Sequence, residues 1–290
     1  MKIIKSACTN VLFPESRKSL DGFRRTVETI AEAGFGWMEF YYDGPGRDKI
    51  GNIIRDNGLN ALYVGVVPHK EKLLHLCNTD EDGRKLAMKQ AYECIDEADG
   101  LGFKHVMYNS GRTQPDAEAG LKALERSFIE MHEYMSRKNI DIKLMLEPCD
   151  SAMDARQHLG PYALSREFAI RMEKHGAPVY LTMDAAHTAE EGEDFVEAVK
   201  ATKPWIDRIH YANCVVDDSS DPLYGDKHIS LNHPRGFFDY AAYRNLNDVF
   251  SGMFDTLIVA LEGYDPNRDP CEHFLEMDRE IFASDAAHAV

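Results

Sequence analysis

The sequence predicts a single α/β domain in which eight parallel strands alternate with helices and close into a (β/α)8 barrel. The chain has 290 residues, which suits one large domain of this kind. Eight short apolar runs are separated by amphipathic stretches from end to end. The turn after the first expected strand contains no glycine, whereas an open dinucleotide-binding sheet has a glycine-rich turn there. We therefore expect one domain over residues 1–290.

The expected strands are mostly continuous apolar runs rather than alternating ones. This pattern is typical of a parallel sheet that is buried on both faces. Alternation with helices implies right-handed crossovers between neighbouring strands. The expected strands cover residues 3–7, 37–42, 61–67, 105–110, 142–147, 179–184, 208–214 and 256–262.

The expected helices are recognised by apolar residues at helical spacing. In the first of them, Phe23, Val27 and Ile30 share one face. We expect Ser165 to cap the fifth helix and Gly176 to end it. The second helix has the weakest pattern. The expected helices cover residues 20–34, 47–57, 84–102, 117–138, 164–176, 193–203 and 270–283.

Charge and cysteine content narrow the class of protein. The chain has 49 acidic and 33 basic residues, a net charge of −16. This balance argues against a nucleic-acid partner, whose phosphates bind Lys and Arg, and it suits a site that attracts divalent cations. The six cysteines are scattered without a C-x-x-C pair. There is no apolar leader and no apolar run of membrane-spanning length, so we expect a cytoplasmic enzyme without a membrane partner.

Four consecutive expected strands, the fifth to the eighth, each carry one potential metal ligand at or near the carboxyl end. These residues are Glu147, Asp184, His210 and Glu262. One carboxylate alone is more often a helix cap or surface charge, and one His on an apolar strand is usually a core residue. The carboxyl ends of barrel strands converge on one rim, where three carboxylates would repel one another without a cation. Oxygen-rich ligation of this kind suits one divalent ion such as Mn, Co or Mg.

Two further residues are expected near the same rim. His187 follows Asp184 by three residues, so it either contacts a substrate oxygen or caps and orients Asp184. Glu39, at the end of the second strand, either binds a sugar hydroxyl or forms a salt bridge with a neighbouring loop. The two long connections, after the third and seventh strands, are expected to frame the substrate.

The four strand-end elements resemble those of a known family. They read Leu-Glu-Pro at 146–148, Met-Asp-x-x-His at 183–187, Ile-His at 209–210 and Leu-Glu-Gly at 261–263. This pattern is similar to the sugar phosphate isomerase/epimerase superfamily, the xylose-isomerase-like TIM barrels that include ketose 3-epimerases and inosose-processing enzymes. The resemblance implies that Glu147 and Glu262 bind the metal and also act as the acid/base pair. It implies that Asp184 and His210 complete the metal site, that His187 contacts the substrate, and that the protein forms a dimer or tetramer.

The chain also departs from close relatives in this superfamily. Ketose 3-epimerases usually carry an Arg about six residues after the His of the seventh strand, where this chain has Val216. Asp226 and His228 resemble a pair that holds an additional metal in the related apurinic endonucleases, and His69 extends that likeness. Asn109 stands where those nucleases have a His ligand. We expect His228 to bind substrate, order its loop or hold a second metal, and we count Asn109, His69 and Arg235 among the candidate substrate contacts.

The predicted function is that of a metal-dependent sugar isomerase or epimerase. One glutamate would remove a proton next to a carbonyl, the metal would stabilise the enediolate, and the second glutamate would return a proton. The same anion can expel a β-hydroxyl, which leaves a dehydratase or lyase acting on a keto-sugar or inosose as an alternative. Phosphodiester hydrolysis and a non-catalytic sugar-binding barrel are further alternatives. The expected partner is a small carbohydrate. Arg112, Lys227 and Arg235 bind a phosphate or a carboxylate, or else form salt bridges.

Overall fold

The computed structural model describes residues 1–282 and confirms the predicted parallel barrel. The strands follow one another in sequence order, and the last pairs with the first to close the order. Position 283, the end of the last expected helix, lies outside the described residues. The strands are β1 (Lys2–Cys8), β2 (Trp37–Phe40), β3 (Asn60–Val64), β4 (His105–Tyr108), β5 (Lys143–Leu146), β6 (Tyr180–Asp184), β7 (Ile206–Ala212) and β8 (Thr256–Glu262).

The helices also follow the sequence pattern, with additional short pieces. All seven predicted helices are present, including the one with the weakest pattern. The longer helices are α2 (Leu20–Glu32), α3 (Arg47–Asp56), α5 (Glu81–Gly100), α6 (Ala117–Lys138), α7 (Tyr162–Lys174), α9 (Phe195–Thr202), α10 (Tyr240–Ser251) and α11 (Pro270–Phe282). The shorter ones are α1 (Thr9–Leu12), η1 (Pro14–Lys18), α4 (Val66–Glu71), α8 (Ala185–Glu190) and η2 (Lys203–Trp205).

Among the details of the sequence prediction that were wrong, two concern a helix cap and a strand end. Ser165 does not cap α7, because the helix begins at Tyr162 and the Ser165 hydroxyl donates to the Pro161 carbonyl within it. The Tyr162 N–H donates instead to the Glu193 carboxylate at 3.0 Å. The first turn of α7 is therefore capped by a residue from a distant part of the chain. The third strand ends at Val64 rather than at residue 67, because Gly65 already has helical backbone angles. Gly176 does follow α7 with a left-handed φ of 68°, as expected of a helix stop.

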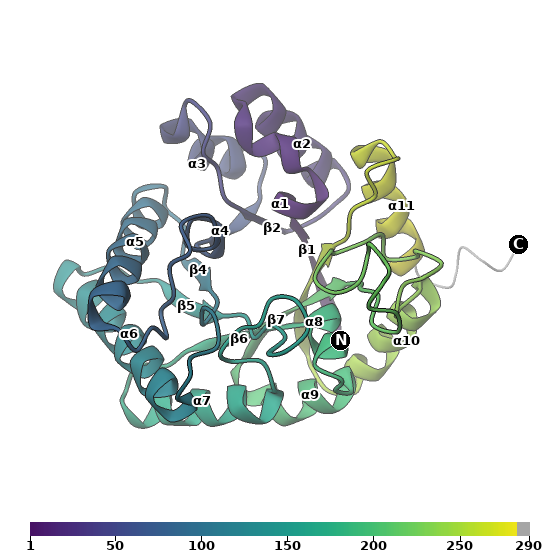
Figure 1. Cartoon of the computed structure of the whole chain (residues 1–290). Helices are drawn as coiled ribbons and strands as arrows, with labels where there is room; N and C mark the ends of the chain where they lie inside the picture. The colour runs from purple at the N-terminus through teal and green to yellow at the C-terminus, as the bar shows by residue number, and fades with distance from the viewer. Residues whose placement is uncertain (283–290) are drawn as a thin grey trace, which may run out of the picture. The chain divides into compact units, whose positions relative to one another are not determined.

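The chain forms two compact units, which we describe separately. The first comprises residues 1–60 and 209–282. In it β1 pairs in parallel with β2 on one side and with β8 on the other, so that Cys8 lies beside Glu39 and Ala7 beside Leu261. The carboxyl ends of these three strands therefore lie together. Figure 1 shows α10 and α11 adjacent in this unit, where Tyr240 bonds Glu276.

The second unit comprises residues 61–208. Within it β3, β4, β5 and β6 pair in parallel in that order, with Tyr108 beside Leu146 and Leu146 beside Leu181. Figure 1 shows α5, α6 and α7 covering the outer side of these strands. Their inward faces are apolar and fully buried at Ala91, Phe128 and Phe168. This packing holds the strand ends in fixed register.

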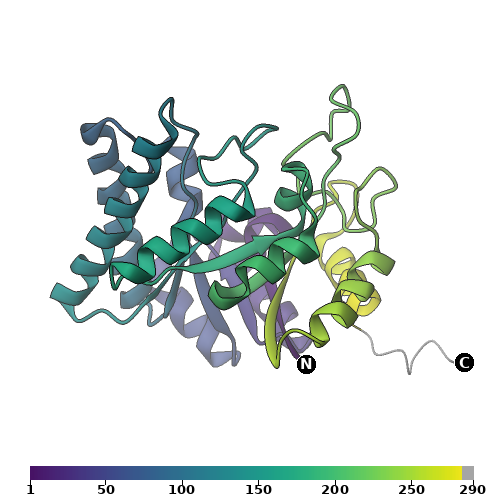
Figure 2. The same ribbon diagram turned by 90° about the horizontal axis from the view of Figure 1, so that it is seen from below.

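The long connections differ in structure. The connection after β3 contains α4, whereas residues 213–239 after β7 hold no regular helix or strand and appear in Figure 2 as an extended green loop.

Among residues 1–282, no helix has both the length and the apolar character that a membrane crossing would need.

Candidate metal centre

The four predicted metal ligands stand at the carboxyl ends of their strands. Asp184 and Glu262 are the last residues of β6 and β8, His210 lies in β7, and Glu147 directly follows β5. All four are buried, with exposures of 0 to 8%. Burying ionised carboxylates is unfavourable unless they are paired, hydrogen-bonded or bound to a metal. Each of these buried groups therefore needs a hydrogen bond, an opposite charge or a metal ion beside it.

In the first unit, the His210 imidazole lies between two carboxylates. Its Nε2 is hydrogen-bonded to Oε2 of Glu39 at 3.0 Å, and its Nδ1 lies 2.6 Å from Oε2 of Glu262. Glu39 is held in turn by the Ser6 hydroxyl, which donates to its Oε1 at 3.0 Å. Since a carboxylate can only accept, the proton of a neutral His210 ring sits on Nε2. Nδ1 is then the nitrogen that can bind a metal.

The close approach of His210 and Glu262 fits a cation. Nδ1 of His210 and Oε2 of Glu262 are both buried at this 2.6 Å contact. Two lone-pair atoms this close repel each other unless a positive charge lies beside both. One imidazole nitrogen and one carboxylate oxygen are suitable ligands for a divalent ion.

Three other groups set the charge of Glu262. The Cys8 thiol donates to its Oε1 at 3.3 Å, and Nε2 of His228 lies 3.6 Å from the same oxygen. Burial alone raises the pKa of this carboxyl, but His228, His210 and the Cys8 hydrogen bond together lower it to about 2. Glu262 is therefore ionised at neutral pH, as a ligand and a base must be.

His228 is held in an unusual backbone conformation. Its φ is 45°, in the left-handed region that only a few per cent of residues other than glycine adopt. Its Nδ1 lies 2.7 Å from Oδ1 of Asp226, which fixes the ring with Nε2 toward Glu262. Such strained residues cluster at functional sites. The sequence pairing of Asp226 with His228 is thus a real contact in the first unit.

In the second unit, Asp184 links the end of β6 to α8. Its Oδ1 accepts from the His187 N–H at 2.8 Å and so caps the helix. The His187 ring has a separate partner, because its Nδ1 lies 3.1 Å from Oε2 of Glu190. Burial lowers the pKa of this ring, but Cys149, Glu190 and Asp184 raise it more, so its pKa is well above the usual value.

The loop after β5 is held rigid beside Glu147. The Asp150 carboxylate accepts four backbone N–H groups, from residues 153 to 156, at 2.7 to 3.4 Å. Asp150, His187 and Glu190 form a close buried group, but the backbone bonds already occupy Asp150. Asp150 therefore acts as an organiser of the loop rather than as a ligand.

Comparison with known proteins identifies the family. Residues 27–253 match the family described as xylose isomerase-like TIM barrel. The chain belongs to this family. The match covers most of the chain, and it confirms the resemblance inferred from the strand-end motifs. No curated protein matches the sequence.

Solved structures of similar fold include named sugar epimerases. A 3-keto-D-glucoside 4-epimerase from E. coli is 16% identical, with a TM-score of 0.65 over 96% of this chain and 97% of the other. A D-psicose 3-epimerase from Clostridium cellulolyticum H10 is 14% identical, with a TM-score of 0.66 over 97% and 91%. A D-tagatose 3-epimerase-like protein is 15% identical, with a TM-score of 0.71 over the full length of both chains. At these identities the likeness concerns the fold.

Within this xylose isomerase-like barrel, the remaining predicted contacts have different surroundings. Asn109 follows β4 and is half-buried. Arg235 is paired with two carboxylates of its own loop, Asp221 at 2.8 Å and Asp217 at 3.3 Å. His69 has both ring nitrogens on backbone carbonyls, those of Gly65 and Ala87. We omit His69 and Arg235 from the proposed site because their polar atoms have these structural partners.

Two residues that matter for the geometry were missed in the sequence. Glu190 follows His187 by three residues, which places both on one face of a helix, but α8 is a single short helix and its stretch was not expected to be helical. Asp150 follows the Leu-Glu-Pro element, and only the loop conformation shows that it binds backbone N–H groups. Glu39 was expected either to bind a sugar hydroxyl or to form a salt bridge with a neighbouring loop, and in the structure it contacts His210.

Proposed function

We propose that this protein is a divalent-metal-dependent sugar isomerase or epimerase. The observation that carries the proposal is the close approach of two buried ligand atoms, Nδ1 of His210 and Oε2 of Glu262, which lie 2.6 Å apart. Membership of the xylose isomerase-like family and the names of its solved relatives support a sugar as substrate. The proposed ion is one Mn, Co or Mg per chain.

The proposed ligands are Glu147, Asp184, His210 and Glu262. They come from four successive strand ends, and in a closed parallel barrel such ends share one rim. The Glu39 carboxylate holds Nε2 of His210, which is the usual way in which a metal-binding imidazole is oriented. Glu39 is therefore proposed as a positioning residue and not as a sugar ligand.

The two glutamates are proposed to move the proton. When bound, the ion supplies Lewis-acid stabilisation of the negative charge that develops on the substrate oxygen. One of Glu147 and Glu262 removes the proton next to the carbonyl, and the other returns one from the far side of the substrate. Return to the opposite face of the same carbon gives epimerisation, and return to the adjacent carbon gives isomerisation. His187, Asn109 and His228 are proposed to hold substrate oxygens.

Exchange of substrate hydrogen with deuterium from solvent tests the proposal. Ketoses, inososes and keto-glycosides would be incubated in D2O with Mn, Co or Mg, and deuterium incorporation would be followed by NMR. Glu147→Gln and Glu262→Gln should each lower exchange by about 10²–10⁴-fold, because each removes a general acid or base. Glu32→Gln, on the exposed face of α2, serves as the control and should exchange at the wild-type rate. Wild-type exchange in either site variant would contradict the role assigned to that glutamate.

A further inference from the structure

The loop that follows β4, residues 109–116, is bonded to a neighbouring loop on each side within the second unit. The connection after β3 reaches it through the Cys77 N–H, which donates to the Ser110 carbonyl at 3.0 Å. The loop after β5 reaches it through the His158 N–H, which donates to the Gly111 carbonyl at 2.8 Å. The three loops are therefore joined at the carboxyl ends of their strands.

Two histidine rings accept backbone N–H groups of this loop, one from each side. Nδ1 of His75, in the connection after β3, accepts from the Arg112 N–H at 3.3 Å. Nδ1 of His158, in the loop after β5, accepts from the Gln114 N–H at 3.2 Å. A backbone N–H can only donate, so both Nδ1 atoms must carry a lone pair and no proton. The loop after β4 is thus held by two imidazoles in one particular state of protonation.

The second nitrogen of His158 completes the protonation state of that ring. It lies 2.9 Å from the Ala117 carbonyl, which can only accept, so Nε2 carries the proton. The neutral ring with its proton on Nε2 therefore satisfies both contacts, whereas a proton on Nδ1 would face the Gln114 N–H with a second donor. The ring also packs closely on α6, because a Cβ at Gly120 would lie 2.5 Å from the imidazole.

The surroundings of both rings favour the neutral form. Burial lowers the pKa of His75, and the Arg112 guanidinium lowers it further. The nearby His69 ring adds no fixed positive charge, because burial lowers its pKa as well. Burial also lowers the pKa of His158, and no charged side chain among residues 1–282 adds to this effect. The two lone pairs are therefore kept at neutral pH.

We propose that His75 and His158 form a clamp that holds the loop after β4 at neutral pH and releases it in acid. The clamp positions Asn109, the first residue of this loop, and so sets the pH range in which that residue can hold a substrate oxygen. This last step rests on the proposed function, which assigns Asn109 to the substrate. A ring in the released loop binds a proton near the ordinary pKa of about 6.5, whereas a ring in the clamp resists protonation, so acidification below about 6.5 favours release.

Amide hydrogen exchange of the full chain, without sugar or added metal, tests the clamp. Protection of the Arg112 and Gln114 amides, corrected for the intrinsic effect of pH on exchange, should fall between about pH 7 and about pH 5.5. The expected fall is about tenfold per pH unit for each ring that is released, because each release then takes up one proton. Protection that stays constant over this range would overturn the proposal.

Asparagine at these two positions removes the titration and keeps the acceptor. Its Oδ1 can occupy the place of Nδ1 and accept from a backbone N–H, but it takes up no proton in this range. Each of His75→Asn and His158→Asn should therefore remove one ring's share of the fall in protection, and the double variant should remove all of it. His175→Asn, at an exposed position directly after α7, is the control and should keep the wild-type dependence. A double variant with the wild-type dependence would overturn the proposal.

Nitrogen NMR of the wild type keeps the test decisive if a variant fails to fold. The chain would be labelled with ¹⁵N-histidine and the ring signals assigned through the backbone. At about pH 7, Nδ1 of His75 and of His158 should both show the shift of an unprotonated nitrogen. A protonated Nδ1 in either ring at this pH would overturn the proposal.

The pH dependence of KM connects the clamp to the reaction. In acid, KM for deuterium exchange should rise more steeply in the wild type than in the double variant, because only the wild type releases the loop that carries Asn109. Effects of acid on metal binding are common to both proteins and cancel in the comparison. Equal dependences would contradict the link to the substrate. If neither protein exchanged any sugar, the proposed function would fail, whereas amide exchange and NMR would still decide whether the clamp exists.

Discussion

The histidines proposed for the metal and the substrate share one feature, a carboxylate on one ring nitrogen. Glu39 contacts His210, Glu190 contacts His187 and Asp226 contacts His228, each within a single unit. Such a partner fixes which nitrogen faces the chemistry. The sequence predicted the strand-end residues, because a buried strand that ends in a carboxylate or His is conspicuous. It indicated Asp226 beside His228, but it did not predict the partners of His210 and His187; Glu39 and His210, for example, are 171 positions apart.

Substitution of Glu39 tests this feature where a metal is proposed. Glu39→Gln should weaken binding of Mn by about 10- to 100-fold, because the His210 ring loses the acceptor that orients it. Titration calorimetry of the metal-free protein measures the effect, with Glu32→Gln as a surface control on the same unit. Unchanged Mn affinity would show that Glu39 does not orient His210 for metal binding. The other role expected from the sequence, contact with a sugar hydroxyl, would then be the simplest one for Glu39.

At the scale of elements, each predicted strand and helix starts within three residues of its observed position. Apolar runs identify buried strands, and β8 was predicted to its exact bounds at 256–262. The start of α7 was wrong because Glu193, from another part of the chain, supplies its cap. Helix α10 was not among the predicted helices, because no helix was assigned between the long connection after β7 and the last strand. The local spacing of residues in the sequence does not predict contacts between segments that are distant along the chain.

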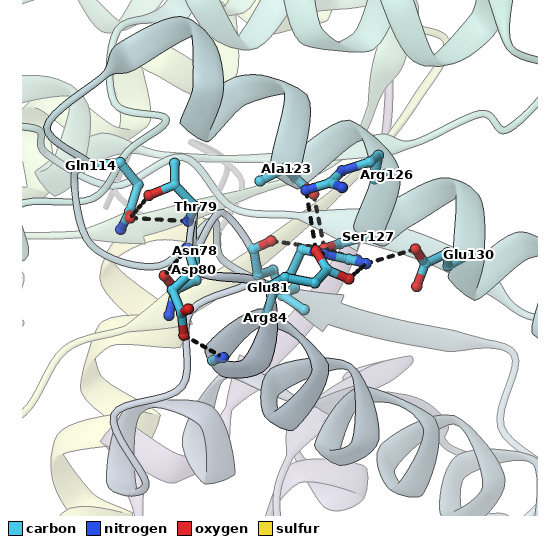
Figure 3. A network of polar contacts seen from close by, with 12 residues as sticks. Asn78, Thr79, Asp80, Glu81, Arg84, Gln114, Ala123, Arg126, Ser127 and Glu130 are labelled. Carbon is cyan, nitrogen blue, oxygen red and sulfur yellow. Dashed lines mark hydrogen bonds and ion pairs between the residues drawn. The ribbon is translucent and has the colours of Figure 1, made fainter.

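A buried arginine joins two of these elements in the second unit. Figure 3 shows Arg84 of α5 reaching Glu130 and Ser127 of α6, with Glu81 on its other side. The Ser127 hydroxyl also donates to the Leu76 carbonyl at 2.7 Å, in the connection that precedes α5. The network therefore ties the connection after β3 to the helices outside the barrel strands.

Removal of that arginine should loosen the connection. Arg84→Met should lower the free energy of unfolding by about 1.5–3 kcal/mol, since hydrogen bonds to charged groups are lost while the stem remains packed. Hydrogen exchange of residues 72–80 should accelerate in the variant. Lys85→Met, an equivalent change on the exposed side of α5, is the control and should alter neither quantity by much. Unchanged exchange in residues 72–80 would mean that the network does not restrain this connection.

At the scale of the whole molecule, the fold was predictable and the division of the chain was not. Alternating strands and helices in sufficient number lead to a closed parallel barrel, and the family match agrees. Neither composition nor a linker in the sequence indicates the two compact units, which comprise residues 1–60 with 209–282 and residues 61–208.

Removal of the proposed metal should lower the stability of the protein. An ion at about 100 times its dissociation constant adds about 2.7 kcal/mol to folding, which corresponds to a Tm change of roughly 5–10 °C for a chain of this size. Calorimetry before and after treatment with EDTA measures the shift. Hydrogen exchange should show faster exchange in the carboxyl ends of both β6 and β8. An unchanged Tm after treatment with EDTA would contradict the proposed metal.

The central claim is that one divalent ion is bound by Glu147, Asp184, Glu262 and Nδ1 of His210. The most direct measurement is anomalous diffraction from crystals of the protein grown with Mn. We predict one manganese peak per chain, about 2.0–2.3 Å from a carboxylate oxygen of each acidic residue and from Nδ1 of His210. A peak elsewhere, a peak bound through Nε2 of His210, or no manganese at these four side chains would contradict the account.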